Sequence, residues 1–387
     1  MDETYDVIIA GSGSAGMAAA VRAAKRGLKV LIVEKAHKIG GTSATSGGVI
    51  WIPNHGLGTD DSSDQAMTYI HAVANGPVRE DRVKAFLEAG PRMIAFLKEM
   101  GLRPTVMPWP DYFPEAPGAR ADRSIVFPKY DGRRLKDLFP LVREQYTRFK
   151  LMNRYTLDFM EANTISTRSP GWVRELVKVI GRYWLDIGTR FITRRDRLFS
   201  LGAALIGPLV ELYVRLGGQF LLGSAVKELV VENGRVVGVV VERWGRRETI
   251  RSRHGVIVCA GGFEWNQKLR DRFFTIPGST RYSSTPPEAN CGEVLEAGLA
   301  IGAATEFTET GWWVPTMTIP IPGVSNFEEI HQATFDVGRP HSVCVNRNGD
   351  RFVDEACGYD RFGNAMMEDQ LKTGADTPCW LVFDATF

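Results

Sequence analysis

An α/β fold is predicted by a strand, a glycine-rich turn, a helix and a second strand that follow one another at the start of the chain. Residues 5–10, YDVIIA, form a β-branched apolar run that passes directly into GSGSAG and the alanine-rich segment MAAAVRAAKRG. The strand LKVLIVEK comes next, and the apolar runs VVGVVVE and GVIVCA occur much later. We therefore expect a parallel sheet covered by helices.

The glycines of the turn are spaced for binding a dinucleotide. Gly11 permits the tight turn, Gly13 lets the backbone approach a pyrophosphate, and Gly16 lets helix and strand pack closely. Glu34 ends the second strand, where a carboxylate can bind the ribose hydroxyls of an adenosine. The agreement of these signals predicts a Rossmann-like site, and glycines that only form a turn are the alternative.

The segment from Gly40 to Gly48 indicates which dinucleotide is bound. Two glycine pairs bracket four hydroxyl side chains within GGTSATSGG. Backbone and hydroxyl donors of this density suit a pyrophosphate and the polar edge of a flavin ring, which favours FAD over NAD. A flexible surface loop is the alternative.

Five further stretches have local patterns. Helices are expected over 83–101 and 202–216, and Asn233-Gly234 predicts a type I′ hairpin between two strands. A helix is expected from Glu293, where Asn290 and Glu293 match a capping pattern only loosely, so capping and ligand contact compete. For the basic, aromatic segment 178–197 the default is a solvated amphipathic helix, and the alternative is a surface that contacts a membrane.

Composition excludes several classes of protein. A formal charge of +2 in 387 residues gives no electrostatic basis for binding nucleic acid. The five cysteines form no CxxC pair and no cluster with metal-ligand spacing, which favours a reducing, cytoplasmic compartment and no metal site. The N-terminus runs straight into a strand, so we expect no signal peptide, and the apolar run 198–226 is too interrupted to span a membrane.

A family resemblance rests on DVIIAGSGSAGMAAA, Glu34 and GGTSATSGGVIWIP. These motifs resemble the flavoprotein family that includes the succinate dehydrogenase and fumarate reductase flavin subunits and the 3-ketosteroid dehydrogenases. The respiratory branch anchors FAD on a histidine, and Gly41 stands at the matching place, so the resemblance implies FAD bound without a covalent link. The cofactor-binding residues implied are Gly11, Ser12, Gly13, Ala15, Gly16, Glu34, Lys35, Gly41, Thr42, Ser43, Ser46, Gly47, Gly48, Val226, Ala260, Gly261, Asn290 and Glu293.

Segment 343–366 resembles the family's "VN..G.RF.NE" signature and predicts strand, turn and strand before the active site. Arg351, Phe352 and Glu355 match it. In fumarate reductases an arginine and a glutamate of this region relay a proton, and an upstream histidine segment grips the dicarboxylate. Here Trp312 and Trp313 replace that histidine, and an apolar aromatic wall suits a large hydrophobic substrate better than a dianion.

Two tyrosines match the 3-ketosteroid dehydrogenase branch. The resemblance implies that Tyr359 is the catalytic base and that Tyr112, in the proline-stiffened loop PWPDYFPEAPG, assists it. Desaturation beside a ketone needs a proton taken from the α carbon and a hydride taken from the β carbon. Tyrosine suits this only if its pKa falls by about three units, worth about 4 kcal/mol, and a second phenol that donates a hydrogen bond would help. Without the resemblance, both tyrosines would be packing residues.

The resemblance also implies the organisation of the chain. Residues 1–303 would form a GR2-type FAD-binding domain with an added β-hairpin and a helical insertion at about 55–200, and 304–387 would begin an α+β substrate domain. Family members continue for a further segment, so we expect an incomplete member. The implied activity is 1,2-dehydrogenation of a 3-ketosteroid, with an external electron acceptor as a further partner; a peripheral membrane contact is the alternative for segment 178–197. A fumarate reductase-like enzyme and an inactive FAD-binding fragment are the alternatives.

Overall fold

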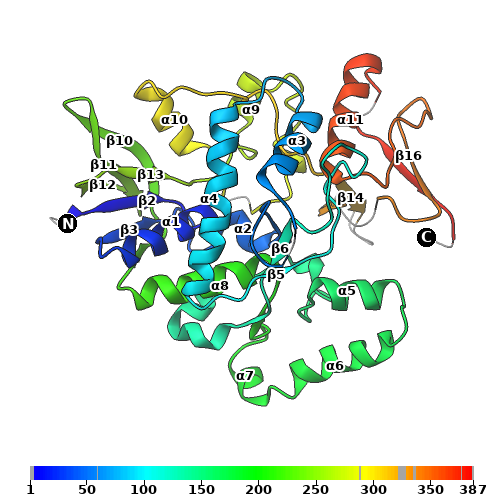
Figure 1. Ribbon diagram of the computed structural model, residues 1–387, viewed down its shortest axis with the longest axis horizontal. Helices are drawn as coiled ribbons and strands as arrows, with labels where there is room; N and C mark the ends of the chain where they lie inside the picture. Colours follow the sequence, from blue (N-terminus) through cyan, green and yellow to red (C-terminus); the bar gives the residue numbers. More distant parts are fainter. Residues whose placement is uncertain are drawn as a thin grey trace.

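The fold was determined as a computed structural model, which describes residues 4–58, 60–286, 289–320, 328–333, 337–375 and 377–385. A four-stranded parallel sheet, in the order β13-β2-β3-β9, lies near the N-terminus at the left of Figure 1. Its strands are β2 (Val7–Ala10), β3 (Val30–Val33), β9 (Gln219–Leu221) and β13 (Val256–Val258). The predicted strand, turn, helix and strand are confirmed, with α1 (Ser14–Lys25) between β2 and β3.

Strands β2 and β3 of this sheet are buried on both faces, which explains their continuous apolar runs. Val7 and Ile9 pack with α1 and α8 (Leu201–Arg215) in one core, whereas Ile8 and Ala10 belong to a second core on the opposite face. A second sheet, ordered β1-β12-β11-β10, covers that face. Its strands are β1 (Thr4–Tyr5), β10 (Ala225–Glu232), β11 (Arg235–Arg243) and β12 (Arg246–Ser252).

The predicted hairpin between β10 and β11 is confirmed. Asn233 and Gly234 have φ of 50° and 74°, which is the left-handed pair that a type I′ turn requires. The prediction missed β12, because RRETIRS has charged residues along its exposed face.

Two glycines let α8 approach the hydroxyl-rich segment, which forms the short helix α2 (Gly41–Thr45). A Cβ on Gly202 would lie 1.9 Å from the Ser43 carbonyl oxygen, and one on Gly48 would lie 2.4 Å from the Leu201 carbonyl carbon. The predicted helix 202–216 is confirmed, and its packing fixes α2 beside the glycine turn.

Residues 50–199 contain most of the remaining helices. The described helices are α3 (Ser63–Val73), α4 (Glu80–Glu99), α5 (Phe159–Ser166), α6 (Trp172–Trp184), α7 (Ile187–Ile192), η1 (Gly132–Leu141) and η2 (Thr147–Phe149). The short strands are β4 (Ile50–Trp51), β5 (Thr105–Val106), β6 (Ser124–Val126), β7 (Tyr130–Asp131) and β8 (Leu198–Phe199). Helices α5 to α7 lie at the bottom of Figure 1, apart from the sheets.

The prediction of one amphipathic helix over 178–197 is wrong in extent, because α6 ends at Trp184 and α7 is a separate short helix. Asp186, between them, leaves the helical conformation with φ −81° and ψ 59°. Its carboxylate lies 3.2 Å from Arg197 Nε, so the break between the two helices is held by an ion pair with the residue that precedes β8.

The C-terminal part contains α9 (Gln267–Phe273), η3 (Thr280–Tyr282), α10 (Glu293–Ala300), β14 (Thr316–Pro320), β15 (Glu328–Gln332), β16 (Ser342–Val345), α11 (Tyr359–Thr373) and β17 (Trp380–Phe383). The second strand expected after Asn348-Gly349 is only an isolated bridge between Val345 and Arg351. The β16 strand pairs instead with β17, and the Glu355 carboxylate accepts the Cys344 N–H at 2.7 Å. The helix α11, which was not predicted, begins at Tyr359.

Within the described residues, no helix has both the length and the apolar character that crossing a membrane requires.

Candidate active site

The glycine turn has the geometry of a dinucleotide cradle. Gly11 has φ 104°, and a Cβ there would lie 2.3 Å from the Cys259 carbonyl oxygen of the neighbouring segment. A Cβ on Gly16 would lie 2.1 Å from the Gly11 oxygen. The helix α1 begins at Ser14 with no acidic residue in its first turn and no side-chain cap, so its positive end suits a phosphate.

Glu34 ties this turn to the next segment. Its Oε2 accepts hydrogen bonds from Ser12 N at 2.9 Å and Ser12 Oγ at 2.6 Å, and its Oε1 accepts one from Ala36 N at 2.9 Å. Ser12 Oγ in turn accepts the Gly40 N–H at 2.9 Å. Oε1 accepts only one hydrogen bond and has further acceptor capacity, so Glu34 is held in place at the end of β3 and can still accept a ribose hydroxyl.

The hydroxyl-rich segment lies directly against α1. Ser43 Oγ accepts the Ser14 N–H at 3.0 Å and contacts Ser14 Oγ at 3.1 Å. Gly41 has φ 51° and no side chain that could bond covalently to a flavin. The cradle, the open helix end and these donors fit FAD, which the residues would hold without a covalent link.

Asn290 joins the hydroxyl-rich segment to the C-terminal part of the chain. Its Nδ2 donates to Thr42 Oγ1 at 2.8 Å and to Glu264 Oε1 at 2.6 Å, and a Cβ on Gly261 would lie 2.0 Å from its Oδ1. The loose capping pattern is not used, because the N-cap of α10 is Gly292 and no side chain caps it. The structure therefore brings Asn290, Thr42 and Gly261 together.

Four more of the residues expected to bind the cofactor are Lys35, Glu293, Val226 and Ala260. Glu293 pairs with Lys35 at 3.0 Å. The Val226 side chain is buried in the core between the two sheets, and Ala260 packs against the same core, so their backbones are the parts that can face a ligand.

The two expected active-site tyrosines lie in contact. The ring centroids of Tyr112 and Tyr359 are 5.4 Å apart, with an interplanar angle of 69°. Tyr359 is the first residue of α11, and a Cβ on Gly358 would lie 3.2 Å from Tyr112 Cγ. Glycine at 358 thus permits the close approach, and the predicted proximity of the two tyrosines is confirmed.

Electrostatics assign different roles to the two phenols. Burial raises the pKa of Tyr359, while hydrogen bonds from Tyr112 and from Trp312 act to lower it. Burial and the hydrogen bond to Tyr359 both raise the pKa of Tyr112. Tyr359 is therefore the more acidic of the two phenols. The expected lowering of the Tyr359 pKa by three units is not produced by these residues, because burial outweighs both donors.

An aromatic wall adjoins the tyrosines. Trp312 meets the Tyr112 ring edge-on at 6.1 Å and is 71% exposed. The Trp313 ring packs against Phe274 at 5.2 Å between centroids, and the Trp313 backbone N–H donates to Asp360 Oδ1 at 2.8 Å. This surface suits a hydrophobic ring system.

The Arg351 and Glu355 pair of the signature segment has a structural role here. Arg351 Nε donates to Glu355 Oε2 at 3.1 Å, and the buried Glu355 also accepts the Cys344 N–H. Sequence reasoning missed Arg361, whose Nη1 donates to the Tyr112 carbonyl at 3.3 Å. Its place two residues after Tyr359 was the only available signal.

The fold and this cradle define a dinucleotide-binding flavoprotein with an aromatic site built around two phenols. A family model described as FAD binding domain matches residues 6–387, and the chain belongs to that family. Its cofactor is FAD.

Three similar proteins narrow the comparison. The 3-oxosteroid 1-dehydrogenase of Mycolicibacterium smegmatis is 34% identical over 403 residues, covering 100% of this chain and 68% of the relative. The 4-oxocyclohexanecarboxylate 2-dehydrogenase of Sinomonas cyclohexanicum is 30% identical, covering 99% of this chain and 65% of that protein. The crystal structure of 3-ketosteroid delta1-dehydrogenase from Sterolibacterium denitrificans in complex with 1,4-androstadiene-3,17-dione matches with a TM-score of 0.92 and 38% identity, covering 99% of this chain and 69% of that one.

Proposed function

We propose that this protein is an FAD-dependent dehydrogenase that introduces the 1,2 double bond into a 3-ketosteroid, with Tyr359 as the base and Tyr112 as its hydrogen-bond donor. The observation that carries the proposal is the contact of the two phenols beside an aromatic wall. The similarity to proteins named 3-oxosteroid 1-dehydrogenase supports the substrate class.

The chemistry follows from the roles of the two phenols. Tyr359, as phenolate, takes the proton from the carbon next to the ketone, and the Tyr112 hydroxyl stabilises that phenolate by donating a hydrogen bond. When bound, FAD would supply the acceptor for the hydride that leaves the adjacent carbon. Trp312 and Trp313 hold the apolar ring system and exclude water.

The residues proposed to hold FAD are those expected from the sequence. The turn from Gly11 to Gly16 would receive the pyrophosphate, Glu34 the ribose, and the segment from Gly41 to Gly48 the pyrophosphate and flavin edge. We also propose the division into an FAD-binding part, residues 1–303, and a substrate part from 304 onwards. Cytoplasmic location and a separate electron acceptor complete the proposal.

The test is the anaerobic reduction of bound flavin by a saturated 3-ketosteroid. Tyr359→Phe should retain FAD and lose the reaction by about 100-fold or more, because the base is gone. Tyr282→Phe, at a half-exposed tyrosine, is the matched control and should reduce flavin as the wild type does. Equal rates in Tyr359→Phe and wild type would refute the role of Tyr359. A fumarate reductase-like enzyme would instead keep its dicarboxylate reaction in Tyr359→Phe, and an inactive fragment would show no flavin reduction.

A peripheral membrane contact is supported by helices α6 and α7, which leave large apolar side chains in solvent. The exposed residues are Val173, Val177, Trp184, Leu185, Ile187, Phe191 and Ile192. The basic residues Arg174, Lys178 and Arg194 are exposed nearby in sequence, as in helices that lie on anionic bilayers.

Cosedimentation with anionic vesicles tests this contact. Phe191→Ser with Ile192→Ser should reduce binding about tenfold or more, whereas Trp244→Ser, at a 79% exposed tryptophan on the hairpin sheet, should not. If the wild-type protein does not sediment with the vesicles, the membrane contact is excluded and the solvated helix is the correct interpretation.

A further inference from the structure

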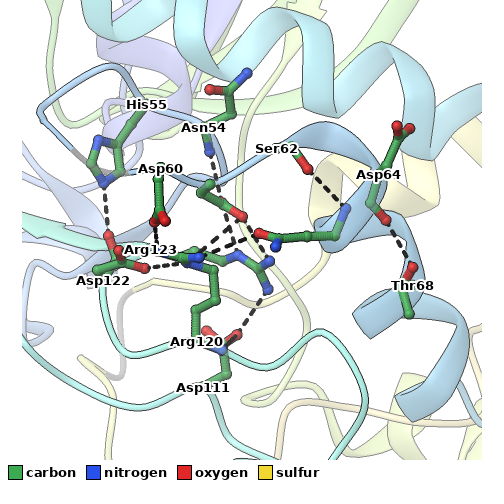
Figure 2. Close-up of polar contacts among 12 residues, drawn as sticks. Asn54, His55, Asp60, Ser62, Asp64, Thr68, Asp111, Arg120, Asp122 and Arg123 are labelled. Carbon is green, nitrogen blue, oxygen red and sulfur yellow. Dashed lines mark hydrogen bonds and ion pairs between the residues drawn. The ribbon is translucent and has the colours of Figure 1, made fainter.

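Arg123, Asp61 and Asp111 form a buried ion network, and Figure 2 shows Arg123 with its bond to Asp111. The Arg123 side chain is 1% exposed, and its Nε and Nη2 donate to the two oxygens of Asp61, both at 2.9 Å. Its Nη1 donates to Asp111 Oδ2, also at 2.9 Å. Asp111 directly precedes Tyr112 in the chain.

Asp111 is held on both of its oxygens. Trp51 Nε1 donates to Oδ1 at 2.7 Å, and the Arg120 backbone N–H donates to Oδ2 at 3.0 Å. Asp111 is therefore fixed by an indole, a guanidinium and a backbone amide, and its side chain is 1% exposed.

The residue on the other side of Tyr112 is also held. The Phe113 N–H donates to the Tyr69 hydroxyl at 3.2 Å. Arg361, on α11, lies 4.4 Å from the centre of the Phe113 ring and donates to the Tyr112 carbonyl. Residues 111, 112 and 113 are thus each bonded to residues that lie outside this loop.

A buried network of this kind is poorly explained by stability alone. Desolvation of one guanidinium and two carboxylates offsets much of their attraction, and apolar replacements of such networks are often as stable or more so. What the network does provide is a fixed geometry, because each bond has a defined direction.

We propose that Arg123, acting through Asp111, and Tyr69, acting through Phe113, are positioning residues that hold the Tyr112 phenol against Tyr359. This inference rests on the proposed function for the role of Tyr112 in catalysis. Neither residue needs to touch the substrate. Their effect is to keep the donor within hydrogen-bonding reach of the base, where small displacements cost rate.

Two mild variants test the proposal, because removal of Arg123 itself could unfold the protein. Tyr69→Phe removes the acceptor for the Phe113 N–H, and Trp51→Phe removes the indole donor to Asp111; both keep a ring. Tyr130→Phe is the matched control, since the Tyr130 hydroxyl donates to Glu211 at 2.8 Å in a buried site away from the loop.

The first measurement does not depend on activity. With 3-fluorotyrosine placed at position 112, the ¹⁹F signal of the holoprotein reports the environment and titration of that phenol. Tyr69→Phe and Trp51→Phe should broaden or split the signal and bring the apparent pKa of residue 112 closer to that of free fluorotyrosine, because the loop is no longer fixed. Tyr130→Phe should leave the signal unchanged. Signals in Tyr69→Phe and Trp51→Phe identical to those in Tyr130→Phe would overturn the proposal.

The second measurement is the flavin half-reaction with a saturated 3-ketosteroid. The limiting rate should fall about tenfold in both loop variants, while the apparent substrate affinity stays within about twofold, because placement of the donor changes and the binding wall does not. A loss confined to affinity would overturn the positioning role. A shifted ¹⁹F signal in a protein that no 3-ketosteroid reduces would leave the positioning of Tyr112 standing and remove the proposed function.

Discussion

Removing the guanidinium of the buried network should destabilise the protein strongly. Arg123→Met keeps an unbranched but shorter side chain and deletes three charge-assisted hydrogen bonds, two to Asp61 and one to Asp111. Both carboxylates stay buried, and each keeps other donors, including the Asn54 N–H for Asp61. Breaking a buried pair in this way typically costs about 3–5 kcal/mol of unfolding free energy, which is the loss we predict.

The pH dependence of this loss follows from Asp61. In the wild type, burial alone would raise the pKa of Asp61, but hydrogen bonds from Arg123 and Asn54 outweigh it and hold the pKa below its usual value. This contribution to stability is complete above the unfolded pKa and is lost as the pH falls through the folded one. In Arg123→Met, burial without the guanidinium raises the pKa of Asp61, so the folded variant binds a proton more readily than the unfolded chain does. The difference in unfolding free energy between the wild type and Arg123→Met should therefore become smaller as the pH falls.

Urea unfolding of the holoprotein at about pH 7.5 and about pH 5 measures both effects. The control is Arg247→Met, which removes an exposed pair with Glu228 whose side chains are 60% and 55% exposed. It should cost about 1 kcal/mol or less at either pH. This account of the network would be refuted if Arg123→Met lost no more unfolding free energy than the control. It would also be refuted if the difference between Arg123→Met and the wild type became larger at low pH.

Two further predictions concern the cofactor and the base. Gly202→Ala places a Cβ 1.9 Å from the Ser43 oxygen, which should cost about 1–3 kcal/mol through overpacking. Titration calorimetry should show this cost as FAD affinity weakened roughly tenfold. Gly181→Ala, whose Cβ would meet nothing within 4 Å, should bind FAD normally, and equal affinities in the two variants would contradict the packing argument. Because the base must be deprotonated, the rate of flavin reduction should rise with pH. Trp312→Phe removes a hydrogen bond that lowers the pKa of Tyr359, so it should move this rise to higher pH, and an unmoved profile would contradict that contact.

Local patterns were sufficient to predict the dinucleotide-binding unit and the hairpin of the cofactor half of the fold. The β2-α1-β3 unit and the Asn233-Gly234 hairpin depend on residues adjacent in sequence, so periodicity and turn chemistry predicted them correctly. The break at Asp186 could not be predicted in this way, because it depends on a carboxylate that pairs with a residue of the returning chain.

The candidate site depended more on the resemblance than on local pattern. Nothing in the spacing of Tyr112 and Tyr359 indicates contact, and each alone would be a packing residue. Arg123 was missed because an arginine between polar residues is normally exposed, and its burial arises only when Asp61 and Asp111 fold against it.

The central claim is that bound FAD takes hydrogen from a 3-ketosteroid with the help of Tyr359. The most direct test is to add a saturated 3-ketosteroid to the yellow holoprotein without oxygen and record the flavin absorbance. We predict that the absorbance bleaches and that the 1,2-unsaturated ketosteroid is formed in an amount equal to the flavin. Flavin that dithionite bleaches but no 3-ketosteroid does would contradict the account.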